Sequence, residues 1–343
     1  MKVLFVGDPH LDINRFDLAK QFLAWLNLTI IELKPDLVVN LGDTFESHSI
    51  IRSEILSEFT NHVEYIYSCG IPYIYVLGNH DMFKPKDAKY HALQTFKVRK
   101  NLHIVDKIQE LYGMTFVPYQ VDPLKFPKQT LPICVAHQTF IGADYGSITT
   151  KEGVDASTIS GAELIISGHI HKRHEIPPRD GRGPAITYPG SPFSQDASDI
   201  DQVKGLMLFD TATYEQTFIE CPLPKWRGLR YEITQDFKID DVYNDLCEQL
   251  KGSKDHWTVE ISGSKAEIIT YLDSQRHQVL VSGLDVKISP KYLDKERRKL
   301  RIEAKSMTHI VSDYVAKVYS GSLDKDLLLA TALTLINTPH TEQ

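Results

Sequence analysis

Short hydrophobic runs alternate with longer amphipathic segments in the first third of the chain. The runs at residues 3–6, 37–41 and 73–77 are rich in Val, Ile, Leu and Tyr, which is typical of buried strands. Between them, residues 17–33 and 51–68 repeat apolar positions at helical spacing. This alternation of strand and helix predicts a largely parallel sheet with helices packed on its faces.

The pattern changes between residues 102 and 221, where brief hydrophobic stretches are separated by turns. These stretches are residues 103–105, 111–112, 115–117, 133–135, 164–166, 205–209 and 218–219. Strands this short, following a strand–helix region, indicate a second sheet packed on the first. The predicted fold class is therefore α/β, or more loosely α+β: a two-sheet β-sandwich flanked by helices.

Prolines mark the expected end of this first domain. The segment 221–225 reads Cys-Pro-Leu-Pro-Lys, so we assign the first domain to residues 1–221. Residues 226–290 alternate strand and helix patterns again and predict a small α/β domain. Residues 291–343 are expected to form helices with apolar faces. Leaving such faces exposed would be unfavourable, by about 25 cal/mol per Å², so they should dock on a partner or fold back on their own domain.

Charge and cysteine usage narrow the class of protein. A formal charge of -7 over 343 residues argues against a protein that coats duplex nucleic acid, since such proteins carry a basic excess. It does not exclude a nucleic-acid enzyme, because bound cations would cancel part of the charge. The four cysteines form no CxxC pair, which predicts reduced thiols. Without a signal peptide or a membrane-length apolar stretch, we expect a cytoplasmic protein with no membrane partner.

Residues of metal-ligand type follow five of the predicted strands. The segments are Asp8-Pro9-His10, Gly42-Asp43, Gly78-Asn79-His80-Asp81, Ala136-His137 and Gly168-His169-Ile170-His171. Ligands bind at the carboxyl ends of strands in layered α/β folds, so these side chains are expected to meet. A single Asp or Asn at a strand end is more often a turn former. The ordered set of five segments is what predicts a site for two divalent ions.

The donor types indicate the ions and the reaction. Imidazole nitrogens with carboxylate and amide oxygens, and no thiolate, suit Mn²⁺, Fe or Zn²⁺ better than Ca²⁺. Asp43 follows a glycine, so its carboxylate can approach and bridge two ions. Two ions roughly 3.5–4 Å apart would activate a water and clamp a phosphoester. His80 could protonate the leaving oxygen or stabilise its charge, and Asp81 could orient the His80 ring.

The series GDPH, GDTF, GNHD, AH and GHIH, over residues 1 to about 195, resembles the calcineurin-like metallophosphoesterase signature. The GDxxDRG pattern of protein serine/threonine phosphatases and the tyrosine ligand of purple acid phosphatases are both missing. Residues 188–193, Tyr-Pro-Gly-Ser-Pro-Phe, followed by Gly205–Asp210, resemble the SbcD nucleases. That family includes the meiotic-recombination-eleven proteins and phage counterparts, and the compact length is closest to the phage members.

The resemblance implies a role for each residue of the series. One ion would be held by Asp8, His10, Asp43 and His171, and the other by Asp43, Asn79, His137 and His169. His80 would be the catalytic histidine, with Asp81 beside it, and Mn²⁺ is the expected ion, with Mg²⁺ as the alternative. Many relatives carry a histidine directly after the GDxF segment. Here Glu46 stands at that position and His48 follows two residues later, so no role is carried over to either.

The resemblance also implies partners. The substrates would be double- and single-stranded DNA, cut by exonuclease and endonuclease action during recombination, repair and replication. Residues 226–290 would cap the site and touch DNA, and residues 291–343 would bind an SbcC-type ABC ATPase. The helix from residue 51 would contribute to a homodimer. For a phage protein, the location would be the host cytoplasm.

Two other functions stay open. A stand-alone phosphomonoesterase or cyclic-nucleotide phosphodiesterase would use the same ions on a small substrate, but it leaves the C-terminal third of the chain poorly explained. A binding scaffold could have kept the fold and lost catalysis. Such proteins usually lose ligands, whereas none is missing from the five segments.

Overall fold

The computed structural model covers the 343-residue chain and describes most of its first 292 residues. The described residues are 1–48, 50–84, 87–98, 101–146, 148–179, 181–233, 239–273 and 286–292, together with 324, 327 and 329. Contacts divide the chain into two compact units, Met1–Tyr292 and Leu293–Gln343. The candidate chemistry lies in the first unit.

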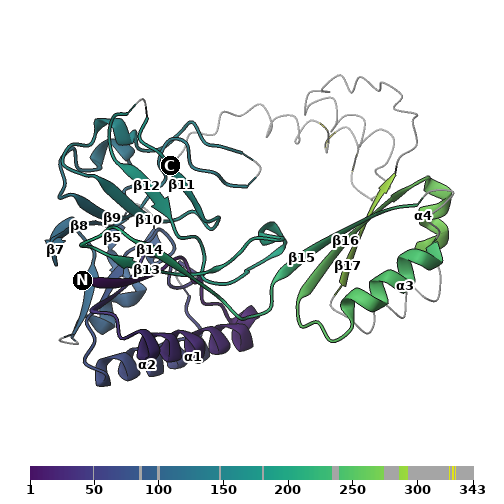
Figure 1. Ribbon diagram of the computed structural model, residues 1–343, viewed down its shortest axis with the longest axis horizontal. Helices are drawn as coiled ribbons and strands as arrows, with labels where there is room; N and C mark the ends of the chain where they lie inside the picture. The colour runs from purple at the N-terminus through teal and green to yellow at the C-terminus, as the bar shows by residue number, and fades with distance from the viewer. Residues whose placement is uncertain are drawn as a thin grey trace. The chain divides into compact units, whose positions relative to one another are not determined.

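The first large sheet has six strands in the order β14-β13-β1-β2-β3-β6 (Figure 1). They are β1 (Lys2–Val6), β2 (Leu37–Asn40), β3 (Tyr73–Val76), β6 (Leu102–Val105), β13 (Gly205–Asp210) and β14 (Gln216–Glu220). β1, β2, β3 and β6 run parallel, as the strand–helix alternation predicts, and β13 joins β1 antiparallel. The crossover helices α1 (Phe16–Leu33) and α2 (Ser53–Ser68) lie together below the sheet in this view.

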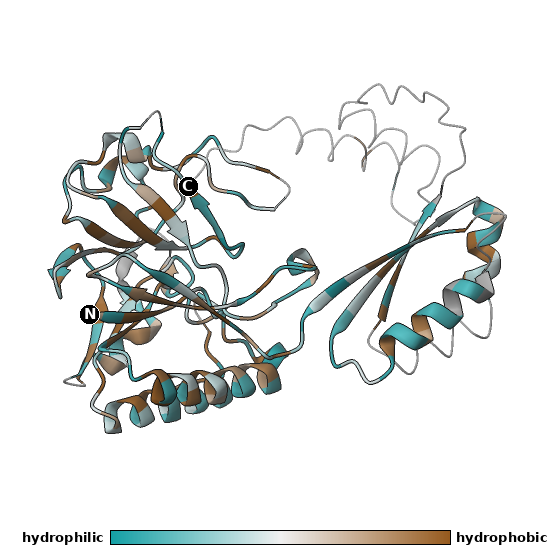
Figure 2. Cartoon of the chain, in the orientation of Figure 1, coloured by the Kyte–Doolittle hydropathy of each residue, from teal (hydrophilic) through white to brown (hydrophobic). Residues whose placement is uncertain are grey.

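The central strand β1 is buried on both faces, because successive side chains of a strand point to opposite sides. Leu4 and Val6 pack in a core with Phe22 of α1. Val3 and Phe5 instead pack in the core shared with the second sheet. Burial on both faces explains the uninterrupted apolar run of this strand. Figure 2 shows the contrast with α1 and α2, which carry hydrophobic and hydrophilic residues on different faces.

The second large sheet also has six strands, in the order β11-β12-β10-β9-β8-β7. They are β7 (Gln109–Leu111), β8 (Met114–Val117), β9 (Ile133–His137), β10 (Leu164–Gly168), β11 (His174–Ile176) and β12 (Ala185–Tyr188). Its inner face packs Phe116, Val135 and Ile166 against residues of the first sheet. The predicted sandwich of two sheets with flanking helices is therefore confirmed.

Four short strands were not expected from the hydrophobic pattern. The hairpin β4 (Met82–Lys84) and β5 (Asp87–His91) alternates apolar with charged residues and contains no hydrophobic run. Strands β11 and β12 pair with each other antiparallel, and β12 also pairs with β10. All are three to five residues long, which is too short for periodicity to stand out from turn sequence.

A third, three-stranded sheet follows the proline-bearing segment 221–225. Its parallel strands are β15 (Trp226–Glu232), β16 (His256–Gly263) and β17 (Val286–Tyr292), connected through α3 (Ile239–Leu250) and α4 (Lys265–Leu272). Tyr231, Leu246, Val259 and Tyr271 form its core. The strand β17 includes Lys291 and Tyr292, which the sequence analysis assigned to the C-terminal helices. The apolar residues 279–281, which belong to the strand pattern predicted within 226–290, lie outside the described residues.

Of the predicted C-terminal helices, the structure describes three positions, Asp324, Leu327 and Leu329, and the two leucines are helical. The remainder of residues 293–343 lies outside the described part of the chain. Among the described residues, the helices are either too short or too polar to cross a bilayer.

Candidate metal centre

The predicted site residues all lie at the carboxyl ends of strands from the two large sheets. Asp8 and His10 follow β1, Asp43 follows β2, Asn79, His80 and Asp81 follow β3, His137 ends β9, and His169 and His171 follow β10. Because the parallel strands of each sheet end at the same edge, residues far apart in sequence meet there. The sandwich brings the two edges together.

Three of these residues have left-handed backbone conformations that L-amino acids seldom adopt. The φ angle is 43° at His10, 49° at Asp43 and 84° at His169. Each such conformation costs on the order of 1–3 kcal/mol and persists where the surrounding structure enforces it. The strain is located in the loops that aim these side chains into the centre, as is common at functional sites.

Two glycines of the motifs are required by close approach. A Cβ at Gly78 would lie 2.1 Å from Asp43 Oδ1, and a Cβ at Gly42 would lie 2.3 Å from His137 Nδ1. No side chain can be accommodated at these distances without moving its neighbour. The glycine before Asp43 and the glycine before Asn79 therefore allow the loops to pack directly against the candidate ligands.

Candidate ligand atoms gather in three groups among the described residues: one is His10, Glu46 and His80, and the other two consist of predicted ligands alone. The first group is Asp8, His10 and His171, and the second group is Asp43, His137 and His169. Within each group the ligand atoms lie within 4.8 Å of one another. In the first group, His10 Nε2 and His171 Nε2 are 3.0 Å apart. In the second, His137 Nε2 and His169 Nδ1 are 3.2 Å apart. Each pair of nitrogens thus converges on a common point.

Asp43 lies between the two groups. Its Oδ2 atom is 3.5 Å from His10 Nε2 and 3.3 Å from His137 Nε2. The amide oxygen of Asn79 joins the second group, 3.1 Å from His137 Nε2. This is the arrangement expected if Asp43 bridges two ions and Asn79 supplies a neutral oxygen to one of them.

Hydrogen bonds fix the orientation of the buried candidate ligands. His137 Nδ1 lies 2.7 Å from the Leu41 carbonyl oxygen. Since a carbonyl only accepts, Nδ1 carries a proton, and Nε2 is the nitrogen that would coordinate an ion in the second group. Asp8 Oδ1 accepts from the His169 backbone N–H at 2.6 Å, whereas the buried Asp8 Oδ2 has no hydrogen-bond partner. Leaving a buried carboxylate oxygen unsatisfied is costly, and a cation would satisfy it.

The buried carboxylate of Asp43 favours positive charge on the groups around it. Burial alone would lower the pKa of His137, but the neighbouring Asp43 carboxylate outweighs burial and raises that pKa to about 9. Burial would raise the pKa of Asp43, yet His137 and His10 hold it well below its ordinary value. Burial, aided by His137, lowers the pKa of His169 to about 4. In the second group, the His169 ring is therefore neutral, whereas the His137 ring attracts a proton.

His80 lies beside the first group and is oriented by the backbone of the loop after β2. Its Nδ1 is 2.7 Å from the Glu46 carbonyl oxygen, so Nδ1 carries a proton and Nε2 is the free nitrogen. The His80 backbone N–H donates to Asp43 Oδ1 at 2.8 Å. The ring of His48 stacks on the His80 ring with centroids 4.4 Å apart.

The expectation that Asp81 orients the His80 ring is wrong. Asp81 is fully buried, and its two oxygens accept from the backbone N–H groups of Thr44 (2.9 Å) and Gly78 (3.0 Å). Burial and the nearby Asp43 charge raise the pKa of Asp81 to about 7. His80 and Asp81 lie in a turn, and the hydrogen bonds of Asp81 tie the loops after β2 and β3 together instead.

Several residues that support the centre had no recognisable sequence signal. Glu46 Oε2 is 2.9 Å from His10 Nδ1, and this interaction with His10 is the main reason why the pKa of Glu46 is lowered to about 2. Arg15 donates to the His10 carbonyl oxygen at 3.2 Å. Gln195 donates to the Asp8 carbonyl oxygen, and Lys204 to that of His171, each at 2.7 Å. Arg15, Gln195 and Lys204 hold backbone atoms rather than ligand atoms, so no sequence motif predicts them.

The donor set fits divalent cations. Imidazole nitrogens converge with carboxylate and amide oxygens, no thiolate takes part, and one buried carboxylate oxygen lacks a partner. Nitrogen and oxygen donors of this kind suit several first-row divalent ions, so the geometry supports ion binding without selecting the ion.

Comparison with known proteins agrees with this geometry. The family model for calcineurin-like phosphoesterases matches residues 1–173. The chain is 27% identical to "Putative phosphoesterase 078R" of Invertebrate iridescent virus 3 over 258 residues, 69% of this chain and 70% of that protein. It is 23% identical over 291 residues (73% of this chain, 74% of the relative) to the DNA double-strand break repair protein Mre11 of Methanococcus maripaludis. It is 22% identical over 265 residues (71% and 75%) to exonuclease subunit 1 of Enterobacteria phage T4.

The family match covers the four strands and loops that carry Asp8, Asp43, Asn79 and His137, and it extends through His171. Members of this family are metal-dependent hydrolases of phosphoesters, which is the chemistry that the two groups of ligand atoms support. The chain therefore belongs to the calcineurin-like phosphoesterase family.

Proposed function

We propose that this protein is a DNA nuclease that hydrolyses phosphodiester bonds with two divalent ions, Mn²⁺ in the first instance and Mg²⁺ as the alternative. One observation carries the proposal. A single carboxylate oxygen, Asp43 Oδ2, lies within 3.5 Å of a ring nitrogen from each of the two ligand groups. A shared carboxylate of this kind is what a two-ion phosphoesterase requires.

Different residues of the centre would bind the ions, donate a proton and position the loops. When bound, the two ions would supply an activated water and neutralise charge on the phosphoester. Asp8, His10, Asp43, Asn79, His137, His169 and His171 would hold them. In its doubly protonated form, His80 would donate the proton on Nε2 to the leaving oxygen, with the Glu46 carbonyl fixing the ring through Nδ1. The buried Asp81 would be a positioning residue that keeps Asp43 and the loop of His80 in register.

Two relatives that align with this chain beyond the family model favour DNA over a small ester as the substrate. The match to the archaeal repair protein spans 291 residues, so it extends well beyond the 173 residues of the family model. A second relative is an exonuclease subunit, matched over 265 residues. Both alignments include sequence outside the metal-binding half, as does the alignment with the viral putative phosphoesterase, whose name specifies no substrate.

The partners proposed for the chain follow from the same reading. The sheet β15–β17 with α3 and α4 would act as a cap that touches DNA. Residues 293–343 would bind an ABC ATPase of the SbcC type, and α2 would contribute to a homodimer. The apolar side chains Leu56 and Tyr65 on α2, with 36% and 37% of their surface exposed, are available for such a contact.

The test is digestion of linear duplex and single-stranded DNA by the full chain with Mn²⁺. Parallel reactions contain EDTA, the His80→Ala variant, or the chromogenic diester bis(p-nitrophenyl) phosphate in place of DNA. We expect metal-dependent cleavage of DNA that His80→Ala largely abolishes. Hydrolysis of the chromogenic diester with no action on either DNA would reject the nuclease in favour of a small-molecule phosphodiesterase. Equal DNA cleavage by both proteins would reject the role of His80.

A further inference from the structure

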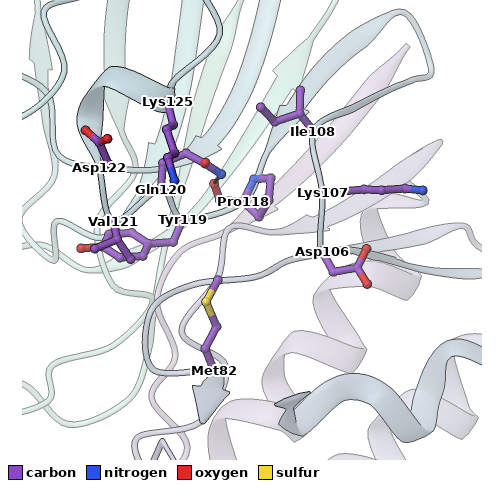
Figure 3. A pocket seen from close by; sticks show the side chains of 10 residues that line it. All are labelled: Met82, Asp106, Lys107, Ile108, Pro118, Tyr119, Gln120, Val121, Asp122 and Lys125. Carbon is purple, nitrogen blue, oxygen red and sulfur yellow. Dashed lines mark hydrogen bonds between the residues drawn. The ribbon is translucent and has the colours of Figure 1, made fainter. Parts of the chain in front are cut away.

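A cavity of about 530 Å³ is lined by Tyr119, whose ring neighbours two histidines of the second ligand group. Two loops form most of its wall (Figure 3): Tyr119, Gln120 and Val121 come from the loop after β8, and Asp106, Lys107 and Ile108 come from the loop after β6. Met82, directly after the His80 loop, lines it too. The volume falls within the range of about 300–1,000 Å³ that is usual for pockets binding small organic groups.

Tyr119 connects this cavity to the metal centre. Its ring centroid lies 5.5 Å from that of His169 and 6.0 Å from that of His137. β8 pairs in parallel with β9, with Val117 opposite Ala136. Tyr119 therefore emerges at the same sheet edge as His137, two residues after the strand ends, and a group bound against its ring would be adjacent to a group held by the second ligand group.

The wall that carries Tyr119 is held in place before any ligand arrives. The Tyr119 backbone N–H donates to the Leu77 carbonyl oxygen at 2.9 Å. The next N–H, that of Gln120, donates to Gln138 Oε1 at 3.0 Å. Gln138 is itself buried next to His137. A preorganised aromatic surface loses little conformational entropy when it binds a planar group.

The lining combines an apolar floor with a cationic rim. Met82 and Pro118 are buried, and Tyr119 is half-buried. Lys107 and Lys125 are exposed at the rim, and among the residues that the structure describes neither forms an ion pair. Of the two acids in the lining, Asp106 pairs with Lys97 and Asp122 caps the turn at Leu124. An aromatic face with free ammonium groups beside it is complementary to a base and its phosphate.

We propose that this cavity, which we call the Tyr119 pocket, binds an unpaired nucleobase next to the phosphodiester that is cut, with the base stacked on the Tyr119 ring and its flanking phosphate near Lys107 or Lys125. The inference rests on the proposed nuclease function and specifies its substrate. A base inside a duplex has both faces covered by its neighbours, so only an unpaired or unstacked nucleotide can enter. The enzyme would therefore prefer single-stranded or frayed ends.

The test uses a single-stranded oligonucleotide that carries 2-aminopurine, whose fluorescence is quenched by stacking, in EDTA so that no cleavage occurs. Overall binding is followed by anisotropy of a dye at the far end. We expect quenching in the wild type and in Tyr119→Phe, which keeps the ring. Tyr119→Leu should abolish the quenching and weaken binding about tenfold, in keeping with measured base–aromatic stacking. Leu124→Ala, 80% exposed on the same loop but outside the lining, is the matched control.

The outcomes separate this inference from the proposed function. Binding without quenching in the wild type, or quenching that survives in Tyr119→Leu, would overturn the Tyr119 pocket even if the protein cuts DNA with Mn²⁺. In Mn²⁺, removing the base from the nucleotide beside the cut should slow wild-type cleavage at that bond about tenfold and leave Tyr119→Leu insensitive to the change. If the protein neither binds nor cuts the oligonucleotide, both the pocket and the nuclease function are rejected.

Discussion

The two ligand groups differ in how the protein holds them. In the second group, His137 is fixed by a main-chain carbonyl, that of Leu41, at the centre of the sandwich. In the first group, the corresponding nitrogen of His10 faces the carboxylate of Glu46, whose side chain is 44% exposed. A carbonyl set in a strand end cannot move away, whereas an exposed carboxylate can.

This difference predicts that an ion in the second group would be held in one position, whereas an ion in the first group could shift. The ligand residues of the two groups are equally buried, but the first group lies next to Glu46 and His80, and His80 is the residue that faces the reacting ester in the proposed function. We expect the second group to bind its ion more tightly and the first to exchange its ion more readily. The predictions below test that asymmetry and the carboxylate that joins the two groups.

Replacing Asp43 should have the largest effect, because both groups lose a ligand at once. Asp43→Asn keeps the shape but removes the charge that bridges the groups. We expect DNA cleavage to fall by on the order of a thousandfold or more, since each bound ion is worth several kcal/mol in such reactions. Metal content, measured by elemental analysis, should fall below two ions per chain. Asp17→Asn, on an 88% exposed side chain of α1, is the matched control and should change neither quantity.

Removing His80 should leave both ions in place and slow the chemistry. For His80→Ala we expect a loss of about a hundredfold to a thousandfold in kcat, which is typical of a general acid. Elemental analysis should still find two ions per chain, since the Asp43, His10 and His137 side chains are untouched. A loss of one ion would instead make His80 a ligand in the group formed by His10, Glu46 and His80.

The contrast between the groups also explains what the sequence could and could not predict. Strand ends and the residues after them follow from hydrophobic runs, so the positions of Asp8, Asp43 and His137 were predictable. The partners of those residues depend on loop conformation. The left-handed backbone at His10 turns its ring toward Glu46, and no local pattern predicts such a φ angle at a non-glycine residue. Asp81 was misassigned because its partners, the backbone N–H groups of Thr44 and Gly78, also depend on how the loops fold.

Neutralising Glu46 should affect the first group alone. Glu46→Gln keeps the side-chain length but removes the charge beside His10 Nδ1. Loss of such a partner typically weakens ion affinity by about 10- to 100-fold. Isothermal titration calorimetry with Mn²⁺ should resolve two binding events, of which the weaker one loses affinity and the tighter one is unchanged. Weakening of both events, or of the tighter one only, would contradict the proposed division. Glu220→Gln, on the exposed strand β14, is the charge-matched control.

Ion binding should release protons. His137, with its pKa raised to about 9, holds a second proton at neutral pH when no cation is present, and the pKa of His10 is also raised. An ion must displace the second proton of His137, so affinity for that ion should fall about tenfold for each pH unit below 9. Titrations in buffers of different ionisation enthalpy should count about one proton per ion at pH 7. A binding enthalpy that does not change with the buffer would show that the rings are already neutral.

The smallest expected effect comes from His48, which stacks on His80 without reaching either group by any described contact. If His48 only positions the His80 ring, His48→Phe should retain cleavage and His48→Ala should lose roughly threefold to tenfold, as expected for one aromatic contact. If the imidazole itself takes part in the reaction, Phe would fail as badly as Ala and the pH profile of kcat would change. The Phe variant therefore decides whether this side of the centre contributes one chemically active histidine or two.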